Sequence, residues 1–221
     1  MPNRNTARAL WHTDSRHSEI RDVRLQPSDD ALKHFTTSHS LVSIGTEKLV
    51  ATGQVPDFIA SEVSVPGMEG QFTLPVKYGY SLCGYLTAQP DTYYHIMHPH
   101  QTAFYVDPEA LTPLPAGLPP QRGVLASNME TAVNAVWDGR PLLGERCLVM
   151  GFGLIGALLA HLLDRYSGVD PWIKELNPER RAKASEMGYR IWEKEDMAFD
   201  LIYNASGNAE AWNELFQYTG M

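Results

Sequence analysis

The chain has 221 residues and a formal net charge of −8, with no basic stripe along it, so a nucleic-acid partner is not expected. Hydrophobic residues make up 43% and charged residues 20%, which is typical of a globular protein of one or two domains. The longest apolar stretch, residues 154–163, is too short to span a bilayer. Cys83 and Cys147 are too few for a disulfide framework and the N-terminus has no apolar signal segment, so we expect a cytoplasmic protein without membrane contact.

Strand-forming residues dominate the first half of the chain. Residues 7–12 and 19–25 predict two strands around a polar turn, and 37–50 contain a further possible strand. Residues 73–88 and 93–106 are again strand-like, with Gly79 and Gly84 indicating close approaches of the backbone. A proline-rich connector, 107–123, follows. We therefore expect a β-rich domain over residues 1–123.

The second half changes to an alternation of helices and strands. Residues 124–138 suit a helix, and residues 147–150 form a short apolar strand before a glycine turn and an apolar helix. Further strands are expected at 171–176, 189–192 and 200–204, and a last helix from about 208 to 218. Asn177 is the expected N-cap, with Pro178 at the first position, of a helix that follows the second of these strands. This order predicts the N-terminal part of a Rossmann fold, strands one to four, over residues 124–221.

The glycine turn carries the strongest functional signal. Gly151, Gly153 and Gly156 give GxGxxG between the predicted strand and helix. In this motif the first glycine allows a tight turn, the second lets a pyrophosphate approach the backbone, and the third lets helix and strand pack closely. The N-terminus of the helix, at Leu154 and Ile155, then offers N–H groups and a dipole to the phosphates.

An acidic residue at the right distance supports a dinucleotide. Glu175 lies at the end of the second predicted strand, about 20 residues beyond the glycines. A carboxylate there accepts hydrogen bonds from the ribose 2′-OH and repels a 2′-phosphate, so NAD is favoured over NADP. Arg180 and Arg181 keep NADP open as the alternative. Ala205 and Ser206, after the last predicted strand, should also face the cofactor.

Several stretches together resemble the medium-chain dehydrogenase/reductase superfamily. They are SIGTE (43–47), PVKYGYSLCGYL (75–86), HPHQT (98–102), ASNMETAVNAVWD (126–138) and ELNPERRAKASEMG (175–188). The resemblance covers nearly the whole chain from Ala7 and implies a GroES-like domain followed by a Rossmann domain. Within the superfamily the chain is similar to a zinc-type branch that lacks most zinc ligands and includes the bacteriochlorophyllide hydroxyethyl dehydrogenases.

The resemblance also shows where zinc ligands are missing. The position of the family's first cysteine ligand falls at Ser43 or Ile44, and its His-Glu pair becomes Tyr80-Ser81. Only Glu130 matches a carboxylate that ligates zinc in some relatives, and the structural four-cysteine site is excluded, so no zinc is expected. His95, His98 and His100 are a weaker alternative metal cluster: on a strand, His98 and His100 would share one face.

Without zinc, hydride transfer needs another group that polarises a carbonyl or takes up a proton. Tyr80 stands at the zinc-binding histidine position, Thr46 at a position that relays protons in relatives, and Glu47 replaces an aspartate behind the metal. Glu130 is a candidate base, and His100 is a further catalytic candidate.

The resemblance implies an NAD(H)-dependent, zinc-independent enzyme that interconverts a small-molecule alcohol and carbonyl in a cleft between the two domains. One alternative is a quinone-reductase-like NADPH enzyme. Another is a truncated cofactor-binding or vestigial protein without turnover, because the sequence stops where relatives enter the fifth strand. In that case strand four is an open edge, and a homodimer is expected only where the missing strands are supplied.

Overall fold

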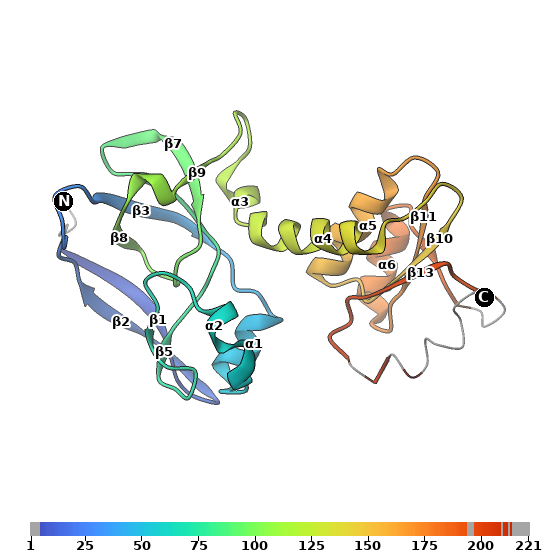
Figure 1. Cartoon of the computed structure of the whole chain (residues 1–221), viewed down its shortest axis with the longest axis horizontal. Helices are drawn as coiled ribbons and strands as arrows, with labels where there is room; N and C mark the ends of the chain where they lie inside the picture. The colour runs from blue at the N-terminus through green and yellow to red at the C-terminus, as the bar shows by residue number, and fades with distance from the viewer. Residues whose placement is uncertain (1–4, 194–196, 209, 212, 214–221) are drawn as a thin grey trace. The chain divides into compact units, whose positions relative to one another are not determined.

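The computed structural model describes residues 5–193, 197–208, 210, 211 and 213. The chain divides into two compact units, residues 1–127 and 128–221 (Figure 1). The boundary lies inside helix α4 (Ala126–Gly139), slightly beyond the expected one after residue 123. Within the described ranges, no helix is long and apolar enough to cross a membrane.

Two antiparallel sheets make up the first unit. Among the described residues, one sheet has the order β2-β1-β5-β4 and the other the order β8-β3-β6-β7-β9. The first contains β1 (Thr6–Asp14), β2 (His17–Arg24), β4 (Glu69–Gly70) and β5 (Val76–Lys77). The second contains β3 (Lys33–Ser40), β6 (Leu82–Leu86), β7 (Gln89–Ile96), β8 (Ala103–Val106) and β9 (Thr112–Pro113).

The core of the larger sheet explains its strand pairing. Phe35 on β3 is fully buried and stacks on Phe104 of β8 with ring centroids 4.9 Å apart. Gly84 on β6 pairs with Thr37, and a Cβ at Gly84 would lie 2.1 Å from the Thr36 carbonyl oxygen. The predicted close approach at Gly84 is therefore confirmed, because β3 and the Phe35 ring occupy the space that a side chain would need.

Short helices complete the first unit. They are α1 (Thr46–Ala51), α2 (Ala60–Val63) and α3 (Pro120–Gly123), with single 3-10 turns η1 (Asp57–Ile59) and η2 (Pro108–Ala110). The stretch 107–123 was expected to be a loop-rich connector, and it holds more structure than that. Strand β9 within it pairs with β7 through Tyr94↔Pro113 and His95↔Thr112.

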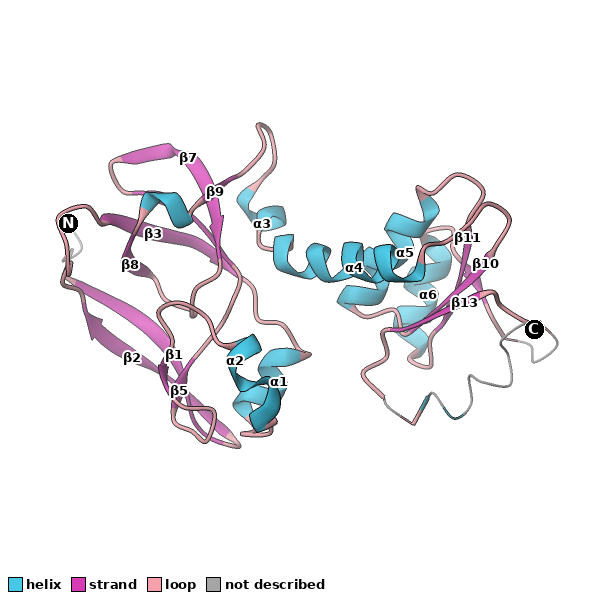
Figure 2. Cartoon of the chain, in the orientation of Figure 1, coloured by secondary structure: helices cyan, strands magenta, loops and turns pink. Residues whose placement is uncertain are grey.

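The second unit is an α/β layer with a parallel sheet. Its described strands are β10 (Arg146–Met150), β11 (Asp170–Lys174), β12 (Arg190–Ile191) and β13 (Leu201–Asn204), in the order β12-β11-β10-β13. This is the order 3-2-1-4 of a Rossmann sheet. Helices α4, α5 (Leu154–Asp164) and α6 (Pro178–Glu186) lie on one face of the sheet (Figure 2).

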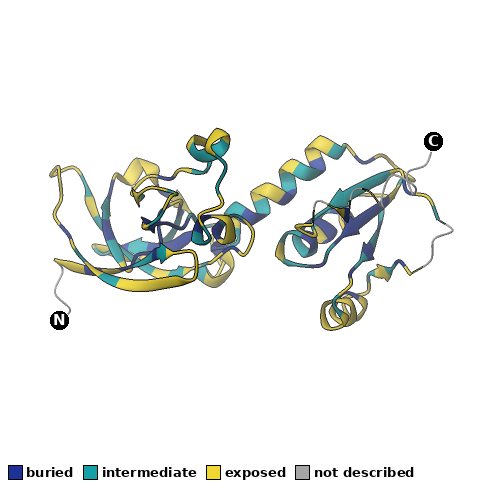
Figure 3. Ribbon diagram, turned by 90° about the horizontal axis from the view of Figure 1, so that it is seen from below, coloured by how far each residue is buried: buried dark blue, intermediate teal, exposed yellow. Residues whose placement is uncertain are grey.

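Strand β10 is buried on both faces, as the central strand of a parallel sheet should be. Cys147 and Val149 pack against the helices, while Leu148 and Met150 pack into a second cluster with Trp192. The strands of this unit carry mainly buried and half-buried residues, whereas buried and exposed residues alternate along α4 (Figure 3).

Most predicted element boundaries hold within a few residues. Asn177 is confirmed as the N-cap of α6, since its side-chain oxygen accepts from the Arg180 N–H at 3.0 Å with Pro178 in the first turn. The strand expected at 189–192 is shorter, covering only Arg190–Ile191. Most of the helix expected from 208 to 218 lies outside the described residues.

Candidate functional site

The glycine turn of the second unit joins β10 to α5. Gly151 has φ +85°, and a Cβ there would lie 2.7 Å from the Ser206 Cα. A Cβ at Gly156 would lie 1.9 Å from the Gly151 carbonyl oxygen. The first and third glycines are therefore required by the turn itself and by the packing of α5 against it.

Gly153 has a different reason to be glycine. Its backbone, at φ −77° and ψ −166°, suits any residue. A Cβ there would meet only the Arg180 Nη1, at 3.6 Å. The space in front of Gly153 is thus open in this structure, and Gly153 is also the N-cap of α5 without a side-chain cap hydrogen bond. An open cradle at a helix N-terminus fits a pyrophosphate.

Glu175 lies just beyond the end of β11 and next to this turn. Its Oε2 accepts from the Phe152 N–H and its Oε1 from the Asn177 N–H, both at 2.7 Å. Burial alone would raise the pKa of Glu175. The hydrogen bonds from Asn177 and Phe152 and the charge of Arg180 outweigh burial, so the pKa lies below its ordinary value. The turn therefore carries a fixed negative charge.

Positive groups lie beside this carboxylate. The Arg180 Nε is 3.8 Å from Glu175 Oε2, and the Arg180 side chain is 56% exposed. Lys174 lines the same pocket and places its Nζ 4.7 Å from the Trp192 ring centroid. The lining of the pocket therefore includes the Glu175 carboxylate and two cationic side chains, Lys174 and Arg180.

The cofactor candidates gather around one pocket of about 260 Å³. Six of the nine predicted residues line it: Gly151, Gly153, Glu175, Arg180, Ala205 and Ser206. The other three, Leu154, Ile155 and Gly156, form the first turn of α5. Sequence reasoning missed Lys174, Leu176, Asn208 and Glu210, which also line the pocket. Their positions at the carboxyl ends of β11 and β13 are the signal that would have found them.

The loop after β13 is held in place by an asparagine. Asn204 Oδ1 accepts from the Ser206 N–H at 3.1 Å and from the Ser206 hydroxyl at 2.6 Å. The Ser206 hydroxyl in turn accepts from the Asn208 N–H at 3.1 Å. Asn204 ends β13, and the Ala205 N–H donates to the Met150 carbonyl oxygen of β10 at 2.8 Å, so the two strands hold Ser206 beside Gly151.

The catalytic candidates come from both units. Tyr80 is half-buried, with its ring centroid 6.4 Å from that of Tyr78. Thr46 is half-buried at the first position of α1. Glu130 is exposed on α4 in the second unit.

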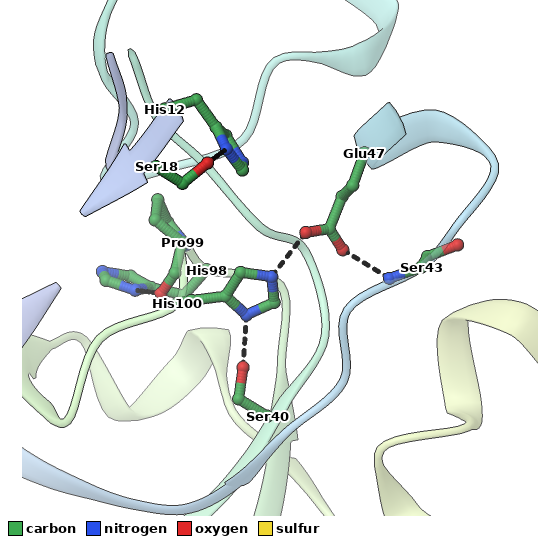
Figure 4. Close-up of polar contacts among 8 residues, drawn as sticks. All are labelled: His12, Ser18, Ser40, Ser43, Glu47, His98, Pro99 and His100. Carbon is green, nitrogen blue, oxygen red and sulfur yellow. Dashed lines mark hydrogen bonds and ion pairs between the residues drawn. The ribbon is translucent and has the colours of Figure 1, made fainter. Parts of the chain in front are cut away.

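A hydrogen-bonded chain in the first unit joins the remaining catalytic candidate, His100, to Ser40 and Glu47 (Figure 4). The Ser40 hydroxyl is hydrogen-bonded to His100 Nδ1, and His100 Nε2 is 2.6 Å from Glu47 Oε2. Glu47 Oε1 accepts from the Ser43 N–H at 2.7 Å. His100 and Glu47 are only 7% and 2% exposed. The structure therefore places His100 between a serine and a carboxylate.

His12 faces the same pair from β1. Its Nδ1 is hydrogen-bonded to the Ser18 hydroxyl at 2.7 Å, and among the described residues its buried Nε2 has no hydrogen-bond partner. Burial lowers the pKa of His12, and the nearby Glu47 charge opposes that shift. Glu47 is thus the negative charge nearest to two buried imidazoles.

The three histidines proposed as a metal cluster make separate contacts. His98 stacks on Phe104 with ring centroids 3.6 Å apart, while the His95 Nε2 lies 3.2 Å from the Ser81 hydroxyl. The expectation that His98 and His100 share a strand face is wrong, because both lie beyond the end of β7 around Pro99. In the described part of the chain, no group of three His, Cys, Asp or Glu residues is arranged to hold a metal ion.

The residues at the family's zinc positions do not fit zinc either. Ser43 is buried and its N–H is bonded to Glu47, and Ile44 is an exposed apolar residue. Ser81 donates to the Val124 carbonyl oxygen at 2.6 Å. A tyrosine and serines replace the thiolate and imidazole ligands that zinc prefers.

Comparisons with known proteins agree with this fold. No family model matches the chain. It is 30% identical over 200 residues to 2-desacetyl-2-hydroxyethyl bacteriochlorophyllide A dehydrogenase of Cereibacter sphaeroides, covering 77% of this chain and 57% of that relative. It is 30% identical over 119 residues to (R,R)-butanediol dehydrogenase of Bacillus subtilis, covering 52% of this chain and 34% of that relative. The chain therefore matches between a third and somewhat over half of these relatives' lengths.

Solved structures extend the likeness across the chain. Acetophenone reductase from Geotrichum candidum, in complex with NAD, has a TM-score of 0.76 at 12% identity, over 97% of this chain and 73% of that one. A β-rich GroES-like unit followed by a Rossmann unit with a glycine turn defines the medium-chain dehydrogenase/reductases. The sequence matches and the fold together support the assignment of this chain to that superfamily.

Proposed function

We propose that this chain carries the cofactor site of an NAD(H)-dependent, zinc-independent oxidoreductase that interconverts an alcohol and a carbonyl. The observation that carries the proposal is the Gly151–Gly153 turn with Glu175 fixed behind it. The relatives, which are named as dehydrogenases of hydroxyl-bearing substrates, support the reaction class. They differ too much from one another in substrate to indicate which alcohol this chain takes.

The residues of the second unit account for nucleotide binding. The open space at Gly153 admits the pyrophosphate, and the N-terminus of α5 stabilises its charge. Ser206, held by Asn204, borders the same pocket. The bound nicotinamide supplies hydride transfer; the chain supplies binding, orientation and proton handling.

Glu175 favours NAD over NADP. Its charge repels a 2′-phosphate, and its lowered pKa keeps that charge present at neutral pH. Arg180 supports the rival NADPH preference of a quinone-reductase-like enzyme, because its exposed guanidinium lies beside both Gly153 and Glu175. The balance between these two charges sets the preference between NADH and NADPH. Hydrogen bonds hold both carboxylate oxygens of Glu175, whereas the Arg180 side chain is exposed, so Glu175 should dominate.

The side chains at the zinc positions support zinc independence. With Tyr80 and Ser43 in place of a histidine and a cysteine, the proton of the alcohol needs a protein group. The Tyr80 hydroxyl and the Thr46 hydroxyl are the proposed donors, with His100 and Glu130 as further candidates. Tyr80 carries the most weight, because it stands at the position of a metal ligand and is half-buried rather than enclosed.

The test is turnover under metal control. NADH oxidation is followed at 340 nm with a panel of ketones and aldehydes, with zinc content measured on the same sample and with a chelator present. We expect zinc-free turnover, and a kcat lowered by about 10²–10⁴-fold in Tyr80→Phe. Tyr93→Phe, a half-buried tyrosine packed edge-on against Tyr85, is the matched control.

Three outcomes separate the candidates. Turnover that survives chelation supports the proposal, and turnover that requires added zinc contradicts zinc independence. NADH binding without turnover on any substrate supports the alternative of a cofactor-binding protein without activity.

A further inference from the structure

The Ser40–His100–Glu47 chain has the parts of an activated nucleophile, and the proposed redox function does not use it in that way. Ser40 is the last residue of β3 and is exposed, whereas His100 and Glu47 are buried. The three side chains come from β3, the 97–102 loop and α1. Hydrogen bonds connect them in the order hydroxyl, imidazole, carboxylate (Figure 4).

The hydrogen bonds fix the tautomer of His100. A carboxylate only accepts, so the hydrogen between His100 and Glu47 belongs to His100 Nε2. In the tautomer that has its one ring hydrogen on Nε2, Nδ1 carries a lone pair and accepts the Ser40 O–H. The Ser43 N–H holds the other oxygen of Glu47, so the carboxylate keeps its orientation. A base on the hydroxyl, oriented by a third group, is the arrangement that makes serine nucleophilic.

A surface pocket lies beside this serine. It has a volume of about 430 Å³, and both Ser40 and His100 line it. Leu10, Ile20 and Val42 give it an apolar wall, and Ile20 and Val42 are 60% and 56% exposed. Arg8 lines the same pocket and adds a positive charge to it, the kind of charge that favours a developing oxyanion. Apolar walls with one cation suit a short apolar acyl ester better than a charged ligand.

We propose that Ser40 is an acyl-accepting nucleophile and that this pocket binds esters of short apolar acids. Ser40 Oγ forms a bond to the acyl carbon, and its proton moves to His100 Nδ1. The ester C–O bond breaks, and the leaving alcohol takes that proton. Water then attacks the acyl–Ser40 ester with His100 again as the base; the acid leaves, and the proton returns to Ser40 Oγ. No oxidant, reductant or nicotinamide takes part, so this hydrolysis needs no step of the proposed redox reaction, although His100 is a candidate in both.

Ser38 provides an internal comparison. It is also exposed on β3 and lines the same pocket. Its hydroxyl donates to the Cys83 carbonyl oxygen at 3.0 Å, so its hydrogen is held by the backbone rather than by a base. Its neighbour His39, 3.1 Å from Ser38 Oγ, is half-buried on the same strand. Reactivity should therefore separate Ser40 from Ser38, although both have similar access to solvent.

The experiment is labelling of the whole chain with a fluorophosphonate probe, located by peptide mass spectrometry, together with hydrolysis of p-nitrophenyl butyrate. We expect the label on Ser40 in the wild-type protein and in Ser38→Ala, and its loss in Ser40→Ala. His100→Gln, shown by thermal unfolding to be folded, should lower the labelling rate and the hydrolysis rate by about 10²-fold or more.

Three labelling results would overturn the proposal: no label on Ser40, equal labelling of Ser38 and Ser40, or unchanged labelling in folded His100→Gln. Because Ser40 is exposed, Ser40→Ala should fold even where His100→Gln does not. In that case the hydrolysis rate of Ser40→Ala tests the proposal. A rate equal to the wild-type rate in Ser40→Ala would also overturn the proposal.

Discussion

Of two alanine substitutions in the glycine turn, one should lower the stability of the second unit and the other should lower its affinity for NADH. A Cβ at Gly156 would lie 1.9 Å from the Gly151 carbonyl oxygen and 3.0 Å from its carbonyl carbon, and backbone atoms cannot move aside cheaply. Gly156→Ala should therefore destabilise the second unit by about 1–3 kcal/mol, the usual cost of overpacking. A cost of 1 kcal/mol lowers the Tm of a domain of this size by about 4–8 °C.

Gly153→Ala should leave the fold intact and weaken the binding of NADH. Its backbone angles suit alanine, and the nearest atom to a new Cβ is the tip of the flexible Arg180 side chain. We expect a stability change within about 1 kcal/mol, which includes the small gain that replacing glycine brings in the unfolded chain. The methyl group would fill the space for the pyrophosphate, so NADH affinity should fall at least about tenfold, or 1.4 kcal/mol.

Thermal unfolding of both variants, paired with NADH titration, measures both effects. Wild-type NADH affinity in folded Gly153→Ala would refute the assignment of the open space to the pyrophosphate. Wild-type thermal stability in Gly156→Ala would refute the packing argument for the third glycine.

Three further predictions follow from charges and burial. Glu175→Gln removes the fixed negative charge and should raise NADPH affinity relative to NADH in parallel titrations, whereas a ratio unchanged from wild type would contradict the role given to Glu175. Burial lowers the pKa of His98 from 6.5 to about 4, so between these pH values the unfolded chain binds a proton that the folded chain does not. The free energy of unfolding should therefore fall as the pH drops from about 6.5 to 4. Unfolding measured over this pH range should show a flatter dependence for folded His98→Gln. Burial raises the pKa of Cys83 to about 11 and of Cys147 to about 12. Both thiols should therefore resist a disulfide reagent at pH 7 until the chain unfolds. Rapid reaction of the native protein would contradict this prediction and show that the core opens.

The pocket at the glycine turn, our candidate nucleotide site, could be located from sequence because its parts are local. Gly151, Gly153 and Gly156 lie within one turn, and Glu175 follows the next strand at a spacing that the βαβ unit fixes. Ala205 and Ser206 were found by the rule that ligands bind at the carboxyl ends of parallel strands, and both line the pocket. The partners of Glu175 were not predictable, since the Phe152 and Asn177 N–H groups carry no sequence signal.

The Ser40–His100–Glu47 chain could not be predicted, because its parts are far apart in sequence. Ser40 and His100 are 60 residues apart, and His100 and Glu47 are 53 apart. His100 was selected from its residue type and its place in HPHQT, and Glu47 from its place in SIGTE, but nothing in either stretch pairs them. The strand assignment of His98 and His100 failed because Pro99 lies between them, beyond the last residue of β7.

The most direct test of the nicotinamide site is calorimetric titration of the purified chain with NADH and, separately, with NADPH. We predict NADH binding with a stoichiometry of about one per chain, the single site of one glycine turn, and weaker binding of NADPH. A folded sample that binds neither nucleotide would contradict the account, because the Gly151–Gly153 turn and Glu175 would then serve packing alone.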